Sequence, residues 1–96
     1  MQYNLTGKHL DISDALKTYV NEKLARIDER DGQIVSAQVT LGTDRHLKTA
    51  EATLHIRSGH TLHADAEHND MYHAVDLLVD KLEKQVRRNK EKLQTH

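Results

Sequence analysis

The sequence predicts an α+β fold in which one four-stranded sheet carries two helices on one of its faces. Two segments repeat apolar residues at helical spacing, and four shorter segments alternate apolar and polar residues as strands do. Their order along the chain is strand, helix, three strands, helix. Amphipathic helices and a one-sided sheet must bury their apolar faces together, so we expect both helices on the same side of a mostly antiparallel sheet.

The composition defines the kind of core and excludes several kinds of site. The 96 residues suit one domain, and we expect 1–96 to form a single unit. The core must be aliphatic, because the chain has no Phe, no Trp and only three Tyr. The absence of Cys excludes disulfides, thiolate metal sites and a cysteine nucleophile. With no apolar signal segment and no apolar run near the roughly 20 residues that span a bilayer, we expect a soluble cytoplasmic protein without a membrane partner.

The first helix is expected from Asp14 to Glu29. Ser13 can cap its N-terminus, and Asp14 suits the positive end of the helix dipole. Asp31-Gly32 is expected to end the helix and turn the chain. The apolar residues that follow the i, i+4 rule form its buried stripe and are Leu16, Val20, Leu24 and Ile27.

Four segments alternate apolar and polar residues and are expected to be strands. They cover residues 2–10, 33–41, 50–56 and 62–66, with 42–46 as a loop between the second and the third. The residues expected to face the core are Tyr3 and Leu5, then Val35, Ala37, Val39 and Leu41, then Ala50, Ala52, Leu54 and Ile56, then Leu62, Ala64 and Ala66. Several of them are alanines, which allow helices to pack close to the sheet.

The turn between the last two strands determines their register. A two-residue loop would pair apolar residues with polar ones along the whole ladder, because a slip of one residue moves every side chain to the other face. A three-residue loop from Ser58 to His60 instead pairs Ile56 with Leu62. We expect this second register, which also places His55 opposite His63 on the other face of the sheet.

The last helix is expected from Asp70 to Leu93, with Asn69 as its cap. On a helical wheel with roughly 100° per residue, its side chains separate by kind. The core stripe contains Val75, Leu78, Val79, Leu82, Val86 and Leu93. The basic stripe contains Lys81, Lys84, Arg88 and Lys92, and the acidic side contains Asp76, Asp80, Glu83 and Glu91.

Positive charge is concentrated at the end of the chain, although the formal net charge is only −1. Residues 1–80 contain eight Lys or Arg against thirteen Asp or Glu, whereas residues 81–96 contain six against two. A solvated surface that complements the helix dipole is one explanation. The basic stripe runs for about three turns, beyond the last-turn range of that effect, and this favours a phosphate-binding surface. Lys23, Arg26 and Arg30 on the first helix would join this surface if the helices lie side by side.

The eight histidines suggest a metal site as an alternative. The expected register makes His55 and His63 neighbours, with Asp65 on the same face, and such a group can take up zinc, nickel or cobalt from solution. Because the chain has no HExxH motif and no cysteine, we treat the pair as an adventitious candidate and expect no physiological metal and no cofactor. It also has no glycine-rich phosphate loop and no GxSxG motif, so we expect neither an enzyme nor a small-molecule substrate.

Three stretches carry the most specific sequence signal, MQYNLTGKHLDISDAL, ATLHI and HADAEHNDMYHAVDLLVDKLEKQVRRNKEKL. They resemble the bacterial ribosome hibernation promoting factors, a family that also includes the ribosome-associated inhibitor and once carried the label sigma-54 modulation protein. The match extends over nearly the whole chain. The most specific parts are N-x-T-G near the N-terminus, A-x-A-E before D-M-Y, and D-K-L in the last helix. The resemblance implies a fold similar to a double-stranded RNA-binding domain.

The resemblance also implies a partner, the small ribosomal subunit and its RNA. Members bind in the channel used by messenger RNA and by tRNA in the A and P sites, and they keep the ribosome idle in stationary phase. The residues that match the family's RNA-contacting positions are Lys23, Arg26, Lys81, Lys84, Arg87, Arg88 and Lys92. Arg87 falls among the acidic residues on the helical wheel. Tyr72, in the D-M-Y motif, is expected to pack rather than to stack on bases.

The chain stops soon after the last helix and therefore looks like the short form of the family. That form favours paired, inactive ribosomes together with the ribosome modulation factor. Three alternatives are kept open. They are a ribosome-associated translation inhibitor that does not promote pairing, a transcription modulator that contacts a sigma factor or polymerase, and a small histidine-metal protein.

Overall fold

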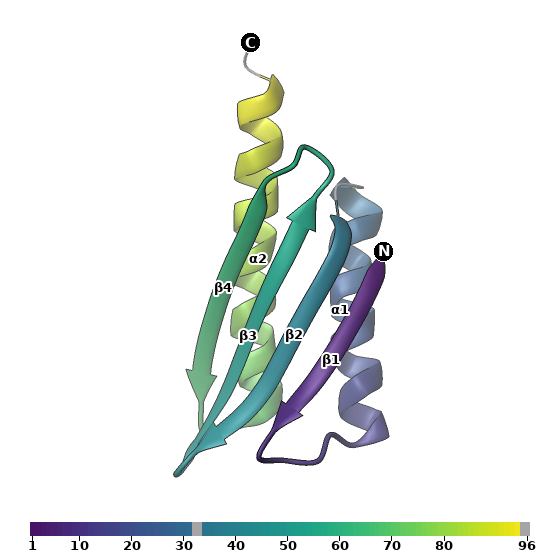
Figure 1. Cartoon of the computed structure of the whole chain (residues 1–96). Coiled ribbons are helices and arrows are strands. Elements are labelled where there is room, and N and C mark those ends of the chain that lie inside the picture. Colours follow the sequence, from purple (N-terminus) through teal and green to yellow (C-terminus); the bar gives the residue numbers. More distant parts are fainter. Residues whose placement is uncertain (32–33, 95–96) are drawn as a thin grey trace.

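The structure is a computed structural model that describes residues 1–31 and 34–94, without the side chains of 31 and 92–94. Its elements follow the expected order (Figure 1). They are β1 (Gln2–Lys8), α1 (Asp14–Asp31), β2 (Ile34–Asp44), β3 (Leu47–Ile56), β4 (Thr61–His68) and α2 (Met71–Gln94). Within the described ranges, no helix is long and apolar enough to cross a membrane.

The four strands form one sheet in the order β1-β2-β3-β4. β1 is parallel to β2, and the other neighbouring strands are antiparallel. Parallel neighbours require a crossover connection, which α1 supplies between β1 and β2. Figure 1 shows α1 and α2 behind the same face of the sheet, as the sequence predicted, and the two helices are in contact. None of the described helices covers the other face.

The core between the sheet and the helices is aliphatic. α1 buries its predicted stripe of Leu16, Val20, Leu24 and Ile27, and α2 buries Val75, Leu78, Val79, Leu82 and Val86. The side chain of Leu93, also expected in this stripe, lies outside the described part. β3 and β4, the strands that contact α2, contribute the buried alanines Ala50, Ala52, Ala64 and Ala66. Tyr3 and Leu5 of β1 are partly buried against this core, as expected.

A β-bulge interrupts the pairing of β2 with β3 between Ile34 and Ser36. The prediction that Val35 faces the core is therefore wrong, because Val35 is 52% exposed whereas Ile34 is 5% exposed. The extra residue of a bulge changes which side chains face the core on either side of it. Gln33, the expected first residue of this strand, lies outside the described residues.

The predicted loop at 42–46 is mostly strand. β2 continues through Gly42 to Asp44, and a two-residue turn leads directly into β3. A Cβ atom on Gly42 would lie 2.9 Å from Thr49 Oγ1. Gly42 suggested a loop, but it lies inside the sheet. A side chain there would be too close to Thr49, so the position needs glycine for space and not for a turn.

The β3–β4 hairpin turns through three residues as expected, but the loop is 57–59 rather than 58–60. The Ile56 amide donates to the His60 carbonyl at 2.9 Å, and Gly59 has a φ of 94°. Glycine adopts this left-handed conformation without the strain that a Cβ atom would cause.

This loop shifts the β3–β4 ladder by two residues from the predicted register. Leu62 pairs with Leu54 rather than with Ile56, and His55 and His63 each lie opposite a threonine instead of each other. A shift of two residues keeps every side chain on its predicted face. Both registers satisfy the alternation pattern, so that pattern could not distinguish them.

Side chains cap both helices. Ser13 Oγ accepts a hydrogen bond from the Leu16 amide at 3.1 Å, as predicted for α1. For α2 the predicted cap, Asn69, is wrong by one residue, because Asp70 Oδ1 accepts from the Tyr72 amide at 3.0 Å. Asp70 also places a negative charge at the positive end of the α2 dipole.

The helix ends differ from the prediction by one or two residues. α1 continues to Asp31, beyond the predicted end at Glu29, and α2 begins at Met71 and ends at Gln94. Such differences are usual at helix ends, where the hydrogen-bond ladder is incomplete. Gly32, which was expected to form the turn after α1, lies outside the described residues.

Replacing Asp70 by Ala should lower the free energy of unfolding by about 1 kcal/mol, because the Tyr72 amide loses its acceptor. In a domain of this size that loss lowers the melting temperature by roughly 4–8 °C. Thermal unfolding followed by circular dichroism measures the change. Asn69→Ala is the matched control, and an equal loss in that variant would mean that Asn69 caps the helix.

Candidate nucleic-acid interface

Two rows of basic side chains lie on the helix layer. The inter-helix row lies along the groove between α1 and α2 and consists of Lys23, Arg26, Arg30 and Arg87. This groove has a volume of about 250 Å³ and is also lined by Asp80 and Glu83 of α2. The outer row lies on the other flank of α2, beside β4, and consists of Lys81, Lys84 and Arg88.

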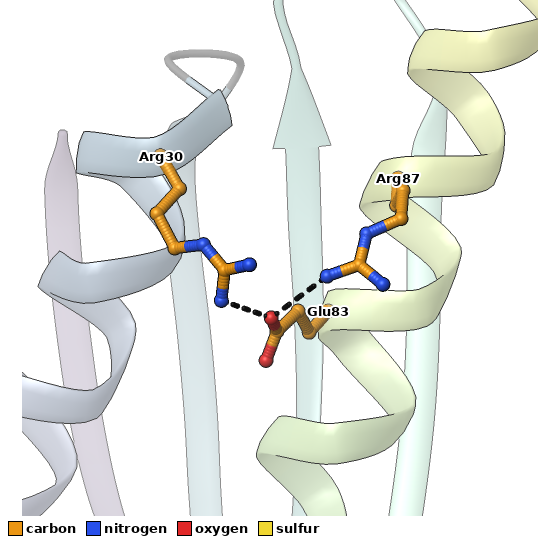
Figure 2. A network of polar contacts seen from close by, with 3 residues as sticks. All are labelled: Arg30, Glu83 and Arg87. Carbon is orange, nitrogen blue, oxygen red and sulfur yellow. Dashed lines mark hydrogen bonds and ion pairs between the residues drawn. The ribbon is translucent and has the colours of Figure 1, made fainter.

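Glu83 joins the two helices within the inter-helix row (Figure 2). Its Oε1 atom accepts hydrogen bonds from Arg30 Nη1 of α1 and from Arg87 Nη2 of α2, the latter at 3.1 Å. The Glu83 side chain is 24% exposed, whereas those of Arg30 and Arg87 are 60% and 51% exposed. The i, i+4 spacing on one helix brings Glu83 beside Arg87, whereas the bridge to α1 depends on how the two helices pack. This bridge holds the Arg30 guanidinium beside α2.

Tyr19 makes a second contact between the helices. Its hydroxyl donates to Asp76 Oδ1 of α2, and Lys23 Nζ lies 3.7 Å from the same oxygen. Lys23 Nζ also lies 5.2 Å from the centroid of the Tyr19 ring, within the range of a cation–π contact. The hydrogen bond to Asp76, together with burial and the carboxylate charge, raises the pKa of Tyr19 to about 12. Tyr72 packs edge-on against Tyr19 with 5.0 Å between ring centroids, so it packs as expected.

The acidic residues of α2 therefore neutralise part of the charge on α1. Asp76 pairs with Lys23, and Glu83 pairs with Arg30. Arg26 is exposed and forms no ion pair within the described part of the chain. The helices do lie side by side, but these carboxylates lie within the inter-helix row, and the outer row is on the other flank of α2. The rows are consequently two separate strips, not one continuous basic surface.

The outer row keeps more of its charge available. Lys84 and Arg88 are exposed and pair with no carboxylate among the described residues. Lys84 forms no ion pair with Asp80, although the two are four residues apart on the same helix. Lys81 Nζ donates to the Asp65 carbonyl of β4 at 2.6 Å. An ammonium group has three donors, so this contact leaves Lys81 able to bind a phosphate as well.

The outer flank of α2 also covers part of the free edge of β4. Gln85 Nε2 donates to the His63 carbonyl at 2.9 Å, close to the bond between Lys81 and the Asp65 carbonyl. In an antiparallel ladder alternate residues direct their backbone groups away from the neighbouring strand, and such edge groups attract other chains. The Asp65 and His63 carbonyls on this edge already accept hydrogen bonds from α2, so they are not available to another strand. The same two bonds link α2 to β4.

The two sheet histidines contact threonines rather than each other. His63 Nδ1 lies 3.1 Å from Thr53 Oγ1, and His55 Nδ1 lies 3.4 Å from Thr61 Oγ1. In residues 1–31 and 34–94, no three His, Cys, Asp or Glu side chains come together in a way that could hold a metal ion. The prediction that His55 lies directly opposite His63 is therefore wrong, for the reason of register given above.

The structure divides the residues selected from the sequence between the two rows. Lys23, Arg26 and Arg87 lie in the inter-helix row, and Lys81, Lys84 and Arg88 lie in the outer row. Lys92 belongs to α2, but its side chain lies outside the described part. Sequence reasoning missed Tyr19 and the bridging role of Glu83. The available signal was the row of acids on the last helix, because Asp76 and Glu83 are the groups that Tyr19 and Arg30 of the first helix contact.

Relatives of this chain are found at high coverage. Residues 3–94 match the family described as Sigma 54 modulation protein / S30EA ribosomal protein. A protein of Azotobacter vinelandii named ribosome hibernation promoting factor is 47% identical over 92 residues, which are 96% of this chain and 85% of that protein. The protein of the same name from Escherichia coli strain K12 is 40% identical over 96 residues, the whole of both chains.

Two solved structures share the fold. A ribosomal subunit interface protein from Coxiella burnetii superposes with a TM-score of 0.89 and 35% identity, over 95% of this chain and 99% of that one. The N-terminal domain of Thermus thermophilus Protein Y superposes with a TM-score of 0.83 and 36% identity, over 92% of this chain and 98% of that one. Sequence and structure comparisons therefore agree over nearly the full length.

Replacing Glu83 by Gln should lower the free energy of unfolding by roughly 0.5–1 kcal/mol, because two arginines lose a charged acceptor at a partly exposed site. The loss should shrink in about 1 M salt, which screens such contacts. Urea unfolding at low and high salt measures both effects. Asp80→Asn changes charge on the same helix at an exposed residue that forms no ion pair with the described residues, and an equal loss there would contradict the bridging role of Glu83.

Proposed function

Because this chain belongs to the family described as Sigma 54 modulation protein / S30EA ribosomal protein, we propose that it is a ribosome hibernation factor. The observation that carries this proposal is the match to relatives named ribosome hibernation promoting factor, at 47% and 40% identity over nearly whole chains. The chain acts by binding, without catalysis and without a cofactor or small-molecule substrate. Its place of action is the bacterial cytoplasm.

The helix layer binds the RNA of the small ribosomal subunit. Lys84 and Arg88 in the outer row and Arg26 in the inter-helix row are exposed cations without carboxylate partners in the described chain, and they contact phosphates directly. Lys23 and Arg87 exchange a carboxylate for a phosphate on binding. Phosphate contacts position a protein on RNA without reading its sequence, and folded RNA is recognised largely by shape. This chemistry suits a fixed site on one folded RNA.

The bound factor lies in the channel used by messenger RNA and by tRNA in the A and P sites. It blocks translation by occupying that space. The helix layer binds the ribosomal RNA, and the rest of the domain excludes messenger RNA and tRNA. The aliphatic core and the inter-helix contacts keep the two helices in a fixed relation, which suits a protein that blocks a channel as a rigid body.

Ribosome pairing is the second part of the proposal. Together with the ribosome modulation factor on the same ribosome, the chain favours paired inactive ribosomes in stationary phase. The alternative within the family is a translation inhibitor that leaves ribosomes single. Sedimentation of ribosomes with both factors present should show the faster, paired species. Ribosomes that stay single while translation is blocked would identify the inhibitor instead.

The family description itself favours one further candidate, because it names modulation of sigma 54. A transcription modulator would act through contacts with a sigma factor or polymerase. It would keep its activity when the cations of the outer row are reversed, since it needs no RNA phosphates. The experiment on these cations therefore separates the two functions.

Reversing Lys84 and Arg88 together to Glu should weaken binding to purified small ribosomal subunits by about a hundredfold at low salt. The slope of the logarithm of the binding constant against the logarithm of the salt concentration should also fall by about two, because two phosphate contacts are lost. Both side chains are exposed, so the fold should be unaffected. Co-sedimentation over a salt series measures both quantities, and circular dichroism checks the fold.

The matched control reverses two exposed cations away from the helix layer, Lys8 and Arg45. It makes the same change in net charge and should leave binding within about twofold of the unaltered protein, apart from the weak long-range effect that salt screens. Equal losses in both double variants would mean that net charge, and not the outer row, determines binding. Unchanged binding in the Lys84 and Arg88 variant would contradict the proposed RNA surface.

A further inference from the structure

We propose that the tip of the β3–β4 hairpin and the facing turns of α2 form a pocket for one unpaired nucleotide of the bound RNA. Its residues are His60 and Leu62 from the hairpin and Arg88 and Asn89 from α2. This inference rests on the proposed RNA binding and extends it, because it assigns uncharged contacts that lie beyond the two basic rows.

An open groove of about 350 Å³ lies between the hairpin and α2, lined by His60, Leu62, Gln85, Arg88 and Asn89. A second groove of about 410 Å³ lies farther along β4, contains Lys81 and Lys84, and shares Gln85 and Arg88 with the first. Figure 1 shows the hairpin tip beside the C-terminal half of α2, beyond the part of the helix that covers β4. An RNA strand that follows the cations of the outer row therefore reaches the hairpin groove.

His60 lies on the helix side of the sheet. It is opposite Ile56, to which its carbonyl is bonded, and Ile56 is a core residue with 3% exposure. Residues directly opposite each other in antiparallel strands share a face. His55 and His63 alternate with core residues and lie on the helix-free face. His60 is thus placed to meet an RNA bound to the helices, whereas His55 is not.

The hydrogen bonds at the hairpin tip determine which atoms His60 and Asn89 can offer. Ser58 Oγ donates to Asn89 Oδ1 at 3.4 Å, and it lies 2.8 Å from His60 Nδ1. These two contacts engage His60 Nδ1 and Asn89 Oδ1 with the Ser58 hydroxyl. This arrangement leaves His60 Nε2 and the Asn89 amide nitrogen available to a ligand.

This set of groups matches an unpaired nucleotide better than a double helix. Leu62 is half-buried and apolar, and the His60 ring and the Arg88 guanidinium are planar groups on which bases stack. The free His60 nitrogen and the Asn89 amide can hydrogen-bond to the Watson–Crick edge of a base, which is accessible only when the base is unpaired. The Arg88 cation adds a phosphate contact. A duplex buries its base faces and its Watson–Crick edges, so it could use the phosphate contact but neither the stacking nor the Watson–Crick contacts.

The test compares His60→Ala and Asn89→Ala with the unaltered protein in binding to purified small ribosomal subunits over a salt series. Each variant should bind about tenfold more weakly at every salt concentration, with an unchanged salt slope, because an uncharged stacking or base contact releases no counterions. Arg88→Gln should instead lower the slope by about one. Stacking is confirmed if His60→Phe, which keeps a planar ring, restores most of the affinity.

His55→Ala is the matched control, because it removes the same side chain from the other face of the sheet. It should bind as the unaltered protein does. Thermal unfolding must show equal melting temperatures for the variants, since a hairpin that unfolds would weaken binding without any pocket. A second arm uses a short single-stranded RNA and a blunt RNA duplex, and His60→Ala should weaken binding to the single strand only.

The outcomes separate this inference from the proposed function. If the unaltered protein binds small subunits and both His60→Ala and Asn89→Ala bind equally well, the groove binds no nucleotide. The proposed function then stands without this inference. If His55→Ala loses as much affinity as His60→Ala, the effect does not come from this pocket. If the unaltered protein does not bind small subunits, both proposals are wrong.

Discussion

The close packing of α2 on an alanine-lined part of the sheet is the constraint on which the rest of the structure depends. The residues concerned, Ala50, Ala52, Ala64 and Ala66, are all at most 6% exposed. Larger side chains would move α2 away from β3 and β4. At the present distance Lys81 and Gln85 reach carbonyls of β4 on one flank of the helix, while Glu83 reaches α1 on the other. The cations left on the outer side then face solvent in a fixed arrangement.

Under the proposed function a protein with a net charge of −1 binds RNA, and the positions of its charges are consistent with this. Carboxylates of α2 are used between the helices, where they hold Lys23 and Arg30, and the cations on the other flank of α2 have no such partners in the described chain. On the helix-free face, Glu51 lies directly opposite Asp65, a like-charge pair that destabilises the sheet slightly. The helix layer therefore attracts a polyanion that the sheet face repels. This difference favours one orientation on the RNA.

Features that follow from a repeating pattern could be predicted from the sequence. The buried stripes of both helices and the order of the elements depend on apolar periodicity, and the basic stripe depends on the same helical geometry. The bulge at Val35 and the shifted β3–β4 register could not be predicted this way, because alternation has a period of two and neither reveals a bulge nor separates registers two residues apart. The contact of Tyr19 with Asp76 joins residues 57 positions apart and depends on how the helices meet. Which cations stay unpaired follows from such contacts, and therefore required the structure.

The central claim is that the helix layer occupies the channel of the small subunit that messenger RNA and tRNA use. The most direct measurement is co-sedimentation of the protein with small subunits that are either empty or already filled with messenger RNA and tRNA, at one moderate salt concentration. The account predicts binding to empty subunits and its loss on filled ones, with the reciprocal loss of tRNA binding when the protein is added first. Equal binding to empty and filled subunits would contradict it.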